Sequence, residues 1–241
     1  VFSPKDIIVE TNTFWYDPAI GQYVLIDEFE YTKGYWILAL QDATVTTEVT
    51  PETEFTINLS EGWNMIGMVG PAGSTIDFTD PNDNPNGSVI GTNTFWYDPA
   101  VGQYVLTSTL ESGKGYWVLA IQDCTLTVGP ATAASPSGVP NLLKPDWIMP
   151  LKLSDNQGST QFLTMGMSDN TSSDIDFRFD LVSPPVSPAS KFTAYILADH
   201  QRFNHLDKDI KPMSQIGTWD IVVDSPKEGV TLSWNQADLP K

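Results

Sequence analysis

Residues 11–46 read TNTFWYDPAIGQYVLIDEFEYTKGYWILALQDATVT, and residues 92–127 read TNTFWYDPAVGQYVLTSTLESGKGYWVLAIQDCTLT. The two stretches lie 81 residues apart and are identical at 25 of 36 positions. Five of the 11 differences exchange one apolar residue for another, so the apolar pattern is kept. Self-similarity at a fixed offset is typical of a repeated structural unit that packs against its copy. We therefore predict two copies of one unit in the first half of the chain.

Each copy has the pattern of a β-hairpin followed by further strands. Aromatic and β-branched residues at 14–16 and 22–26 flank residues 17–21 (DPAIG), which place Pro and Gly where a tight turn favours them. The short run at 35–40 is apolar on both faces, which is typical of a strand in a covered sheet. Residues 55–59 alternate between apolar and polar side chains, which predicts a half-buried strand.

The composition changes after the second copy. Residues 130–141 are rich in Pro, Ala and Ser and have no periodicity, which is typical of a semi-extended linker. Short alternating runs separated by turn signals follow, which predicts a β-sandwich over residues 142–241. We predict an all-β chain in which a duplicated β-repeat domain (1–129) precedes this sandwich. A short helix at 205–210 is the one helical element that we expect.

The charge balance and the scarce nucleophiles exclude several classes of protein. The 241 residues include 12 Lys and Arg against 30 Asp and Glu, a net charge of −18, so we expect no nucleic-acid partner. The single cysteine, Cys124, cannot form an internal disulfide or a thiolate metal cage. With two histidines, no G-x-S-x-G motif and no phosphate-binding loop, we expect no enzyme. No apolar run reaches the roughly 18 residues of a membrane span, so we expect no direct membrane insertion.

The order of the motifs resembles a module of secreted bacterial and archaeal surface proteins, in which a GKGYW strand alternates with a GWNLIG strand. The matching residues are Lys33–Trp36, Gly62–Gly67 and Lys114–Trp117. The C-terminal part resembles a second module of such proteins, and its matching residues are Ile175-Asp176, 183–188, 206–210, Trp219 and 231–234. The resemblance implies an extracellular, modular β-protein of the cell surface, whose second module often precedes a sorting domain, sometimes of the type IX secretion kind. It implies no catalytic residue.

The resemblance also implies a role. No GWNxIG element precedes the first copy and no sorting domain follows Lys241, so we expect a segment of a longer polypeptide. Its partners would be other domains of that polypeptide or neighbouring surface subunits. We expect a structural or adhesive role as a spacer, sheath or filament building block. The alternative is a carbohydrate-binding module of a secreted hydrolase, which would bind glycans.

Four tryptophans are the candidate glycan-stacking residues, namely Trp15, Trp36, Trp96 and Trp117. Aromatic faces attract the C–H faces of sugar rings, and two copies of a site would increase avidity. The same rings could instead fill the core, because a thin β unit needs large side chains to bury enough area. Neighbouring strand residues point to opposite faces, so adjacent aromatics both become core only where both faces are covered.

Two stretches are candidate calcium sites, although the sequence requires no cofactor. The first offers closely spaced oxygen donors, which are Asp80, Asn82, Asp83, Asn84 and Asn86. An EF-hand is excluded there because position 12 falls on Asn93 instead of Glu, and a solvated turn is the alternative. The second comprises Asp174, Asp176 and Asp180, which strand alternation would place on one face. Arg178 would share that face and compete with a metal, so the alternative is a mutually neutralised surface.

Overall fold

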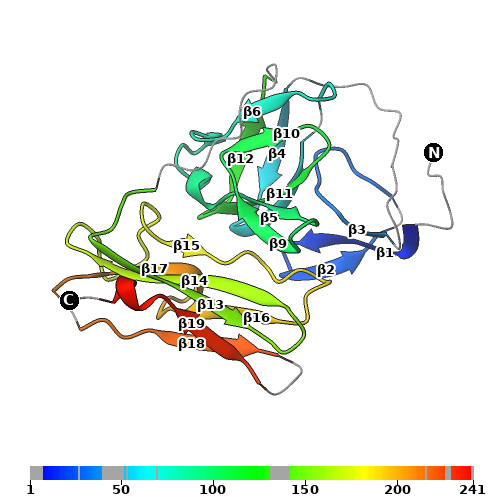
Figure 1. Cartoon of the computed structure of the whole chain (residues 1–241). Helices are drawn as coiled ribbons and strands as arrows, with labels where there is room; N and C mark the ends of the chain where they lie inside the picture. Colours follow the sequence, from blue (N-terminus) through cyan, green and yellow to red (C-terminus); the bar gives the residue numbers. More distant parts are fainter. Residues whose placement is uncertain are drawn as a thin grey trace. The chain divides into compact units, whose positions relative to one another are not determined.

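The computed structural model describes residues 8–26, 28–39, 52, 54–68, 70–130, 142–214, 216–225 and 229–239. These residues form strands, turns and two short 3-10 turns, so the all-β prediction is confirmed. The chain divides into two compact units, Val1–Pro140 and Asn141–Lys241, which Figure 1 colours from blue to green and from yellow-green to red. No helix in the described part is long and apolar enough to cross a membrane. The predicted linker lies outside the described residues from position 131 onward.

The described strands of the first unit form four sheets. The first has the order β2-β1-β3, with β1 (Ile8–Asp17), β2 (Gln22–Leu25) and β3 (Trp36–Ala39). The second has the order β5-β11-β8-β9, with β5 (Gly62–Gly67), β11 (Gly115–Ala120), β8 (Phe95–Asp98) and β9 (Gln103–Leu106). The third has the order β4-β12-β7, with β4 (Phe55–Leu59), β12 (Cys124–Val128) and β7 (Asn82–Asn84). The fourth pairs β6 (Thr75–Asp77) with β10 (Thr109–Glu111), and the 3-10 turn η1 (Gly91–Asn93) precedes β8.

The two predicted hairpins form in the same register. Trp15 lies opposite Val24 in β1–β2, and Trp96 lies opposite Val105 in β8–β9. In each turn the Asp carboxylate accepts a 2.9 Å hydrogen bond from the backbone N–H two residues further on. The glycine that closes each turn has a φ of +65° or +70°, a conformation that side chains with a Cβ rarely adopt. The DPAxG sequence therefore encodes the turn in both copies.

The main core of the first unit lies between the strands that follow the hairpins. The side chains of Leu110, Val118, Ala120 and Leu126 are fully buried in it. On β4 the predicted alternation holds, because its first and last residues are buried while Thr56 and Asn58 are exposed. The buried Cys124 belongs to the same core, as expected of a small residue at the position of an alanine in the first copy.

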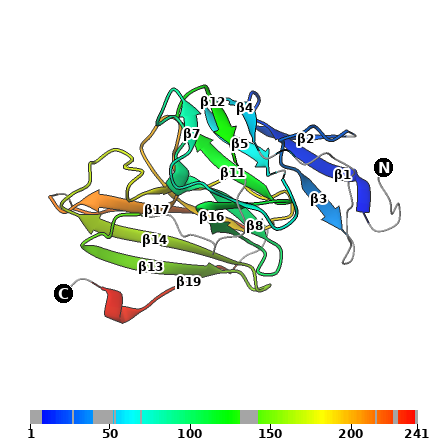
Figure 2. The same ribbon diagram turned by 90° about the horizontal axis from the view of Figure 1, so that it is seen from above.

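The strands of the second unit belong to one mixed sheet with the order β18-β16-β17-β14-β13-β19. Their bounds are β13 (Trp147–Ser154), β14 (Thr160–Ser168), β15 (Leu181–Val182), β16 (Thr193–Leu197), β17 (His205–Pro212), β18 (Asp220–Asp224) and β19 (Thr231–Trp234), followed by η2 (Gln236–Asp238). Figure 2 shows β13, β14 and β17 side by side. One hydrogen-bonded network joins these strands, because β17 pairs with β14, β15 and β16. The β-sandwich over residues 142–241 stays a prediction.

Two local predictions in the second unit are wrong. Residues 174–180 form turns instead of a strand, and the Asp180 N–H donates to the Asp176 carbonyl at 2.8 Å. The turn buries Phe179 and Asp180 together, although strand alternation would place these neighbours on opposite faces. Residues 205–210 belong to β17 and not to a helix. Leu206 and Ile210, four residues apart, share a face in a strand as well as in a helix, so their spacing does not discriminate between the two.

Candidate functional site

The two copies of the repeat contact each other through aromatic rings. Trp36 of β3, in the first copy, lies edge-on to Tyr97 and Tyr104 of the second copy. The ring centroids are 4.5 and 6.2 Å apart, and the ring planes are inclined by 66° and 72°. Such T-shaped pairs place the positive edge of one ring against the negative face of another, which stabilises them beyond simple burial.

The second copy makes the same contact in the opposite direction. Trp117 of β11 lies edge-on to Tyr16 and Tyr23 of the first copy, with centroids 4.9 and 6.3 Å apart. These three residues occupy the same repeat positions as Tyr97, Tyr104 and Trp36. We call these six rings the aromatic interlock. Each copy therefore supplies one tryptophan and two tyrosines, as in an isologous interface between identical subunits.

Burial in the interlock is deepest at Trp117, and the other five rings are half-buried. Trp117 is 2% exposed. Burial raises the pKa of both the Tyr23 and the Tyr104 hydroxyls. The nearby Tyr23 hydroxyl raises the pKa of Tyr104 further, so these two equivalent residues lie close to each other. The sequence does not mark Tyr23 or Tyr104 as a candidate site residue, because each lies in a QYVL strand with no other residue typical of a binding site.

Trp15 forms part of a charged cluster instead of an open platform. The Lys33 ammonium lies 3.8 Å from the centroid of the half-buried Trp15 ring, which is the geometry of a cation–π contact. The same ammonium lies 2.7 Å from a carboxylate oxygen of Glu30. The Tyr35 hydroxyl accepts a 2.7 Å hydrogen bond from the backbone N–H of Glu30 and thereby holds the backbone of Glu30 in place.

Trp96 has the same surroundings in the second copy. The Lys114 ammonium lies 3.9 Å from its ring centroid and 3.0 Å from a Glu111 carboxylate oxygen. The Tyr116 hydroxyl accepts a 2.6 Å hydrogen bond from the Glu111 N–H. The lysine and the aromatic residues of the GKGYW motif therefore support the same cluster twice. A sugar that stacked on Trp15 or Trp96 would compete with the lysine for the ring.

The two glycines of the GKGYW and GWNMIG motifs lie where backbones cross closely. The Gly34 N–H donates to the Met65 carbonyl at 3.1 Å, and Lys33 forms a bridge with Ile66, so the KGYW segment of the first copy (33–36) begins beside β5. A Cβ atom on Gly34 would lie 2.7 Å from the Ile66 carbonyl oxygen, and one on Gly67 would lie 2.5 Å from that of Lys33. Both distances are shorter than real Cβ contacts allow. These positions therefore require glycine for close approach of the two chains.

The first calcium candidate closes a loop through its own carboxylate. Asp83 on β7 is buried, and its two oxygens accept N–H bonds from Gly87 at 3.1 Å and from Val89 at 2.5 Å. The other four predicted donors, Asp80, Asn82, Asn84 and Asn86, are exposed. Each oxygen of Asp83 thus accepts a backbone N–H bond, so this carboxylate stabilises the loop without a cation.

The three residues of the second calcium candidate interact with different groups instead of facing one site. The Arg178 Nε donates to Asp176 at 2.8 Å, and this pairing lowers the pKa of Asp176. Asp180 accepts N–H bonds from Asp176 at 2.7 Å and from Ile210 at 2.8 Å, while Asp174 is exposed. Within the described residues, no group of three or more His, Cys, Asp or Glu side chains is arranged to hold a metal.

Buried acids on β17, and Asp180 bonded to it, are a feature that sequence reasoning misses. Burial raises the pKa of Asp180 to about 7 and that of Asp207 to about 6, and it also raises the pKa of Asp209. The Ser183 hydroxyl donates to Asp207 at 2.7 Å. Burial lowers the pKa of Lys208, which the nearby Asp180 partly offsets. The alternating D-K-D pattern gives no sign of this burial, because charged residues are usually exposed.

Comparison of the chain with family models, with curated proteins and with solved structures returns no match.

Proposed function

We propose that the chain is a non-catalytic, extracellular structural segment of a larger modular surface protein. The aromatic interlock carries this proposal, because its six rings join one copy to the other. Trp36 and Trp117 direct their rings at tyrosines of the opposite copy. Packing of this kind makes a rigid block of two small sheets that would each be marginal alone.

Charge and motif order support the extracellular part of the proposal. A net charge of −18 keeps a surface hydrated and disfavours nonspecific association. The GKGYW and GWNMIG segments, which resemble modules of secreted surface proteins, lie side by side at the Gly34–Gly67 crossing. The partners of such a segment would be other domains of the same polypeptide or neighbouring surface subunits.

Immunolabelling of the cells that make the parent protein tests the proposal. We expect an antibody against residues 1–241 to label intact cells. We also expect deletion of these residues to change the surface layer or adhesion without removing an enzymatic activity. Labelling only after permeabilisation would overturn the extracellular assignment. Loss of a specific catalytic activity, restored by the purified chain, would overturn the structural role.

The geometry does not favour the alternative, a carbohydrate-binding module. Trp117 is almost fully buried, Trp36 packs against two tyrosines, and a lysine lies over each of the other two indoles. Stacking on a sugar requires an open ring face. Binding on a glycan array that Trp15→Ala or Trp96→Ala abolished would reverse this preference.

A further inference from the structure

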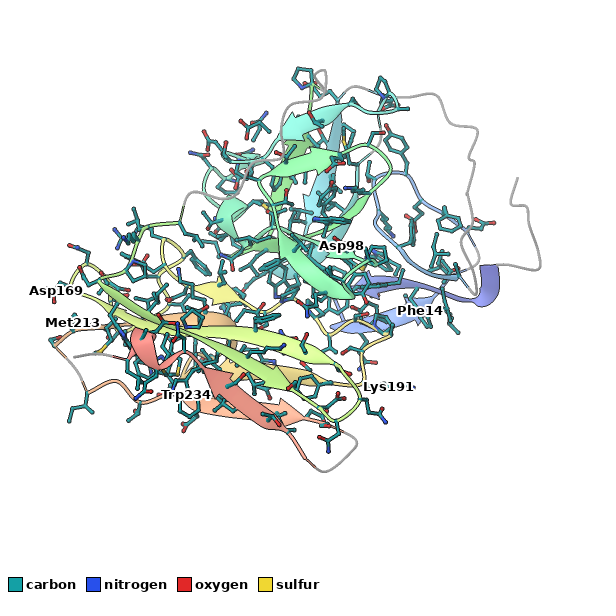
Figure 3. All side chains as sticks on the ribbon, viewed as in Figure 1. Phe14, Asp98, Asp169, Lys191, Met213 and Trp234 are labelled. Atoms are coloured by element: carbon teal, nitrogen blue, oxygen red, sulfur yellow. The ribbon has the colours of Figure 1, made fainter. Side chains whose placement is uncertain are left out.

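The strand β19 forms an open edge of the sheet in the second unit. Among the described residues it pairs only with β13, and all four of its side chains are exposed. Leu232 is 43% exposed and Trp234, labelled in Figure 3, is 52% exposed. An uncovered edge with large apolar side chains is a template for pairing with another strand.

The apolar face of β13 continues onto this edge. Leu151 lies opposite Trp234, and Leu153 lies opposite Leu232. Residues directly opposite in an antiparallel pair share a face of the sheet. Both leucines are only 2% exposed, whereas their neighbours on β19 are open to solvent. The apolar stripe of the sheet therefore ends at an uncovered strand.

Charge distinguishes this edge from the opposite one. Residues 229–237 contain no charged side chain. The strand at the opposite end of the order, β18, begins with Asp220 and ends with Asp224, which are both exposed. If two β18 strands paired antiparallel about Val222, each Asp220 would face an Asp224, and like charges opposite each other are destabilising. In a chain of net charge −18, β19 is thus the one of these two edges that admits a second, equally acidic copy.

We propose that β19 pairs antiparallel with β19 of a second copy of this chain, with Ser233 opposite its counterpart. Opposite residues must lie on the same face, so the pair is centred on a residue, and among these registers the one centred on Ser233 brings the two large apolar side chains of each strand together. It places each Leu232 opposite the Trp234 of the other copy and so extends the apolar stripe across the contact. Aromatic and aliphatic residues in cross-strand pairs stabilise a sheet. The pairing rests on the proposed structural role, for which it supplies a contact between subunits.

The contact is weak on its own. A four-residue strand addition buries less than the roughly 1,200 Å² of a stable interface, so we expect dimers at concentrations on the order of 100 µM. Repeated copies along a surface would add such contacts and raise the effective concentration.

Cysteine crosslinking of the full chain tests both the partner and the register. In Ser233→Cys the two thiols would lie directly opposite, within reach of a disulfide. In the matched control Thr231→Cys, the thiols would lie about 13 Å apart, too far to bridge. Cys124 is buried and does not compete. We expect Ser233→Cys to form disulfide dimers at least about tenfold faster than Thr231→Cys, since only one pair is in register.

Equal rates, a faster control or no dimer in either variant would overturn the proposal. Sedimentation of the unmodified chain gives an independent measurement that does not depend on the cysteine variants. We expect its average mass to rise with concentration, and Ser233→Lys, which places two like charges opposite, to remain monomeric. A chain that stays monomeric up to the millimolar range would overturn the pairing while leaving the surface-labelling result, and with it the proposed function, intact.

Discussion

The indole of Trp117 packs edge-on at 4.9 Å from the ring of Tyr16, although the two side chains belong to different copies of the repeat. The equivalent pair, Trp36 and Tyr97, makes the same contact at 4.5 Å. The two tryptophans differ in burial, however, because Trp117 is 2% exposed whereas Trp36 is half-buried. The same contact therefore holds the unit together from both sides with unequal strength.

Removal of the Trp117 side chain should destabilise the first unit strongly. Trp117→Ala leaves a large cavity in the interlock, and we expect a loss of about 3–5 kcal/mol in the free energy of unfolding. Trp36→Ala should cost less, because part of its ring is already in contact with solvent. Urea unfolding followed by tryptophan fluorescence measures both losses. An equal loss for the two variants would contradict the predicted effect of burial, and no loss for Trp117→Ala would contradict the contribution of the interlock to stability.

The close backbone crossing predicts that alanine substitution destabilises the chain at Gly67 of β5 but not at Gly115, which lies opposite it in β11. In Gly67→Ala the new methyl group would lie 2.5 Å from the Lys33 carbonyl oxygen, so we expect a loss of about 2 kcal/mol or more. In Gly115→Ala the nearest atom would lie 3.6 Å away, an ordinary contact, so we expect a change of less than about 0.5 kcal/mol. Thermal unfolding of both variants tests this difference. A tolerated Gly67→Ala would show that the strands need not approach so closely.

The buried acid Asp180 predicts that the second unit loses stability as the pH rises. Its pKa of about 7 lies above the value of about 3.9 in an unfolded chain. The protonated form therefore favours folding, and this contribution is complete below about pH 4 and is lost as the pH rises through about 7. We expect a loss on the order of 2–4 kcal/mol across this window, with Asp207 acting in the same direction.

Asp180→Asn tests this pH dependence. The amide cannot ionise, so the stability of the variant should vary less between about pH 4 and 8 than that of the unmodified chain. Neighbouring charges act on the same site, because Asp176 and Asp209 raise the pKa of Asp180 and Asp180 raises that of Lys208. Denaturant titrations at a series of pH values measure the slope. An unchanged slope in Asp180→Asn would assign the dependence to other groups.

The loop that follows β7 should be held by Asp83 and not by calcium. Asp83→Ala removes the acceptor of two backbone hydrogen bonds, and we expect a loss of about 2–3 kcal/mol because buried donors are left unsatisfied. The melting temperature of the unmodified chain should be the same with calcium and with a chelator. A melting temperature that falls on chelation would show that calcium contributes to the fold. Thermal scans on matched samples distinguish the two cases.

Local patterns predict the hairpins well and the turns of the second unit poorly. The DPAxG turns form as predicted because the signal and the bonds lie within five residues. Residues 174–180 also alternate like a strand, but the Asp176 carbonyl bonds within the turn and Asp180 bonds to a residue 30 positions away. Alternation alone does not reveal such bonds.

The sequence also does not predict which rings of the interlock contact each other. The repeat predicts that two copies pack together, but which rings meet depends on strand pairing across many residues. The KGYW segment of the first copy begins beside β5, and β11 lies along the same strand. Burial of Asp180 and Asp207 also follows from tertiary packing and leaves no mark in the local pattern.

Because each copy of the repeat contacts the other through the same residues, the interlock restricts which positions can differ in sequence between the two copies. A change in one ring alters a contact with the other copy, so neither half can vary alone at these positions. All six ring positions are still matched between the copies, whereas six of the 11 differences fall in residues 26–32 and their counterparts. In the first copy that segment links β2 to β3, in the second its counterpart contains β10, and in neither copy does it supply a ring to the interlock. The sequence differences between the copies are thus concentrated in residues 26–32 and their counterparts, whereas the residues through which the copies contact each other are the same in both.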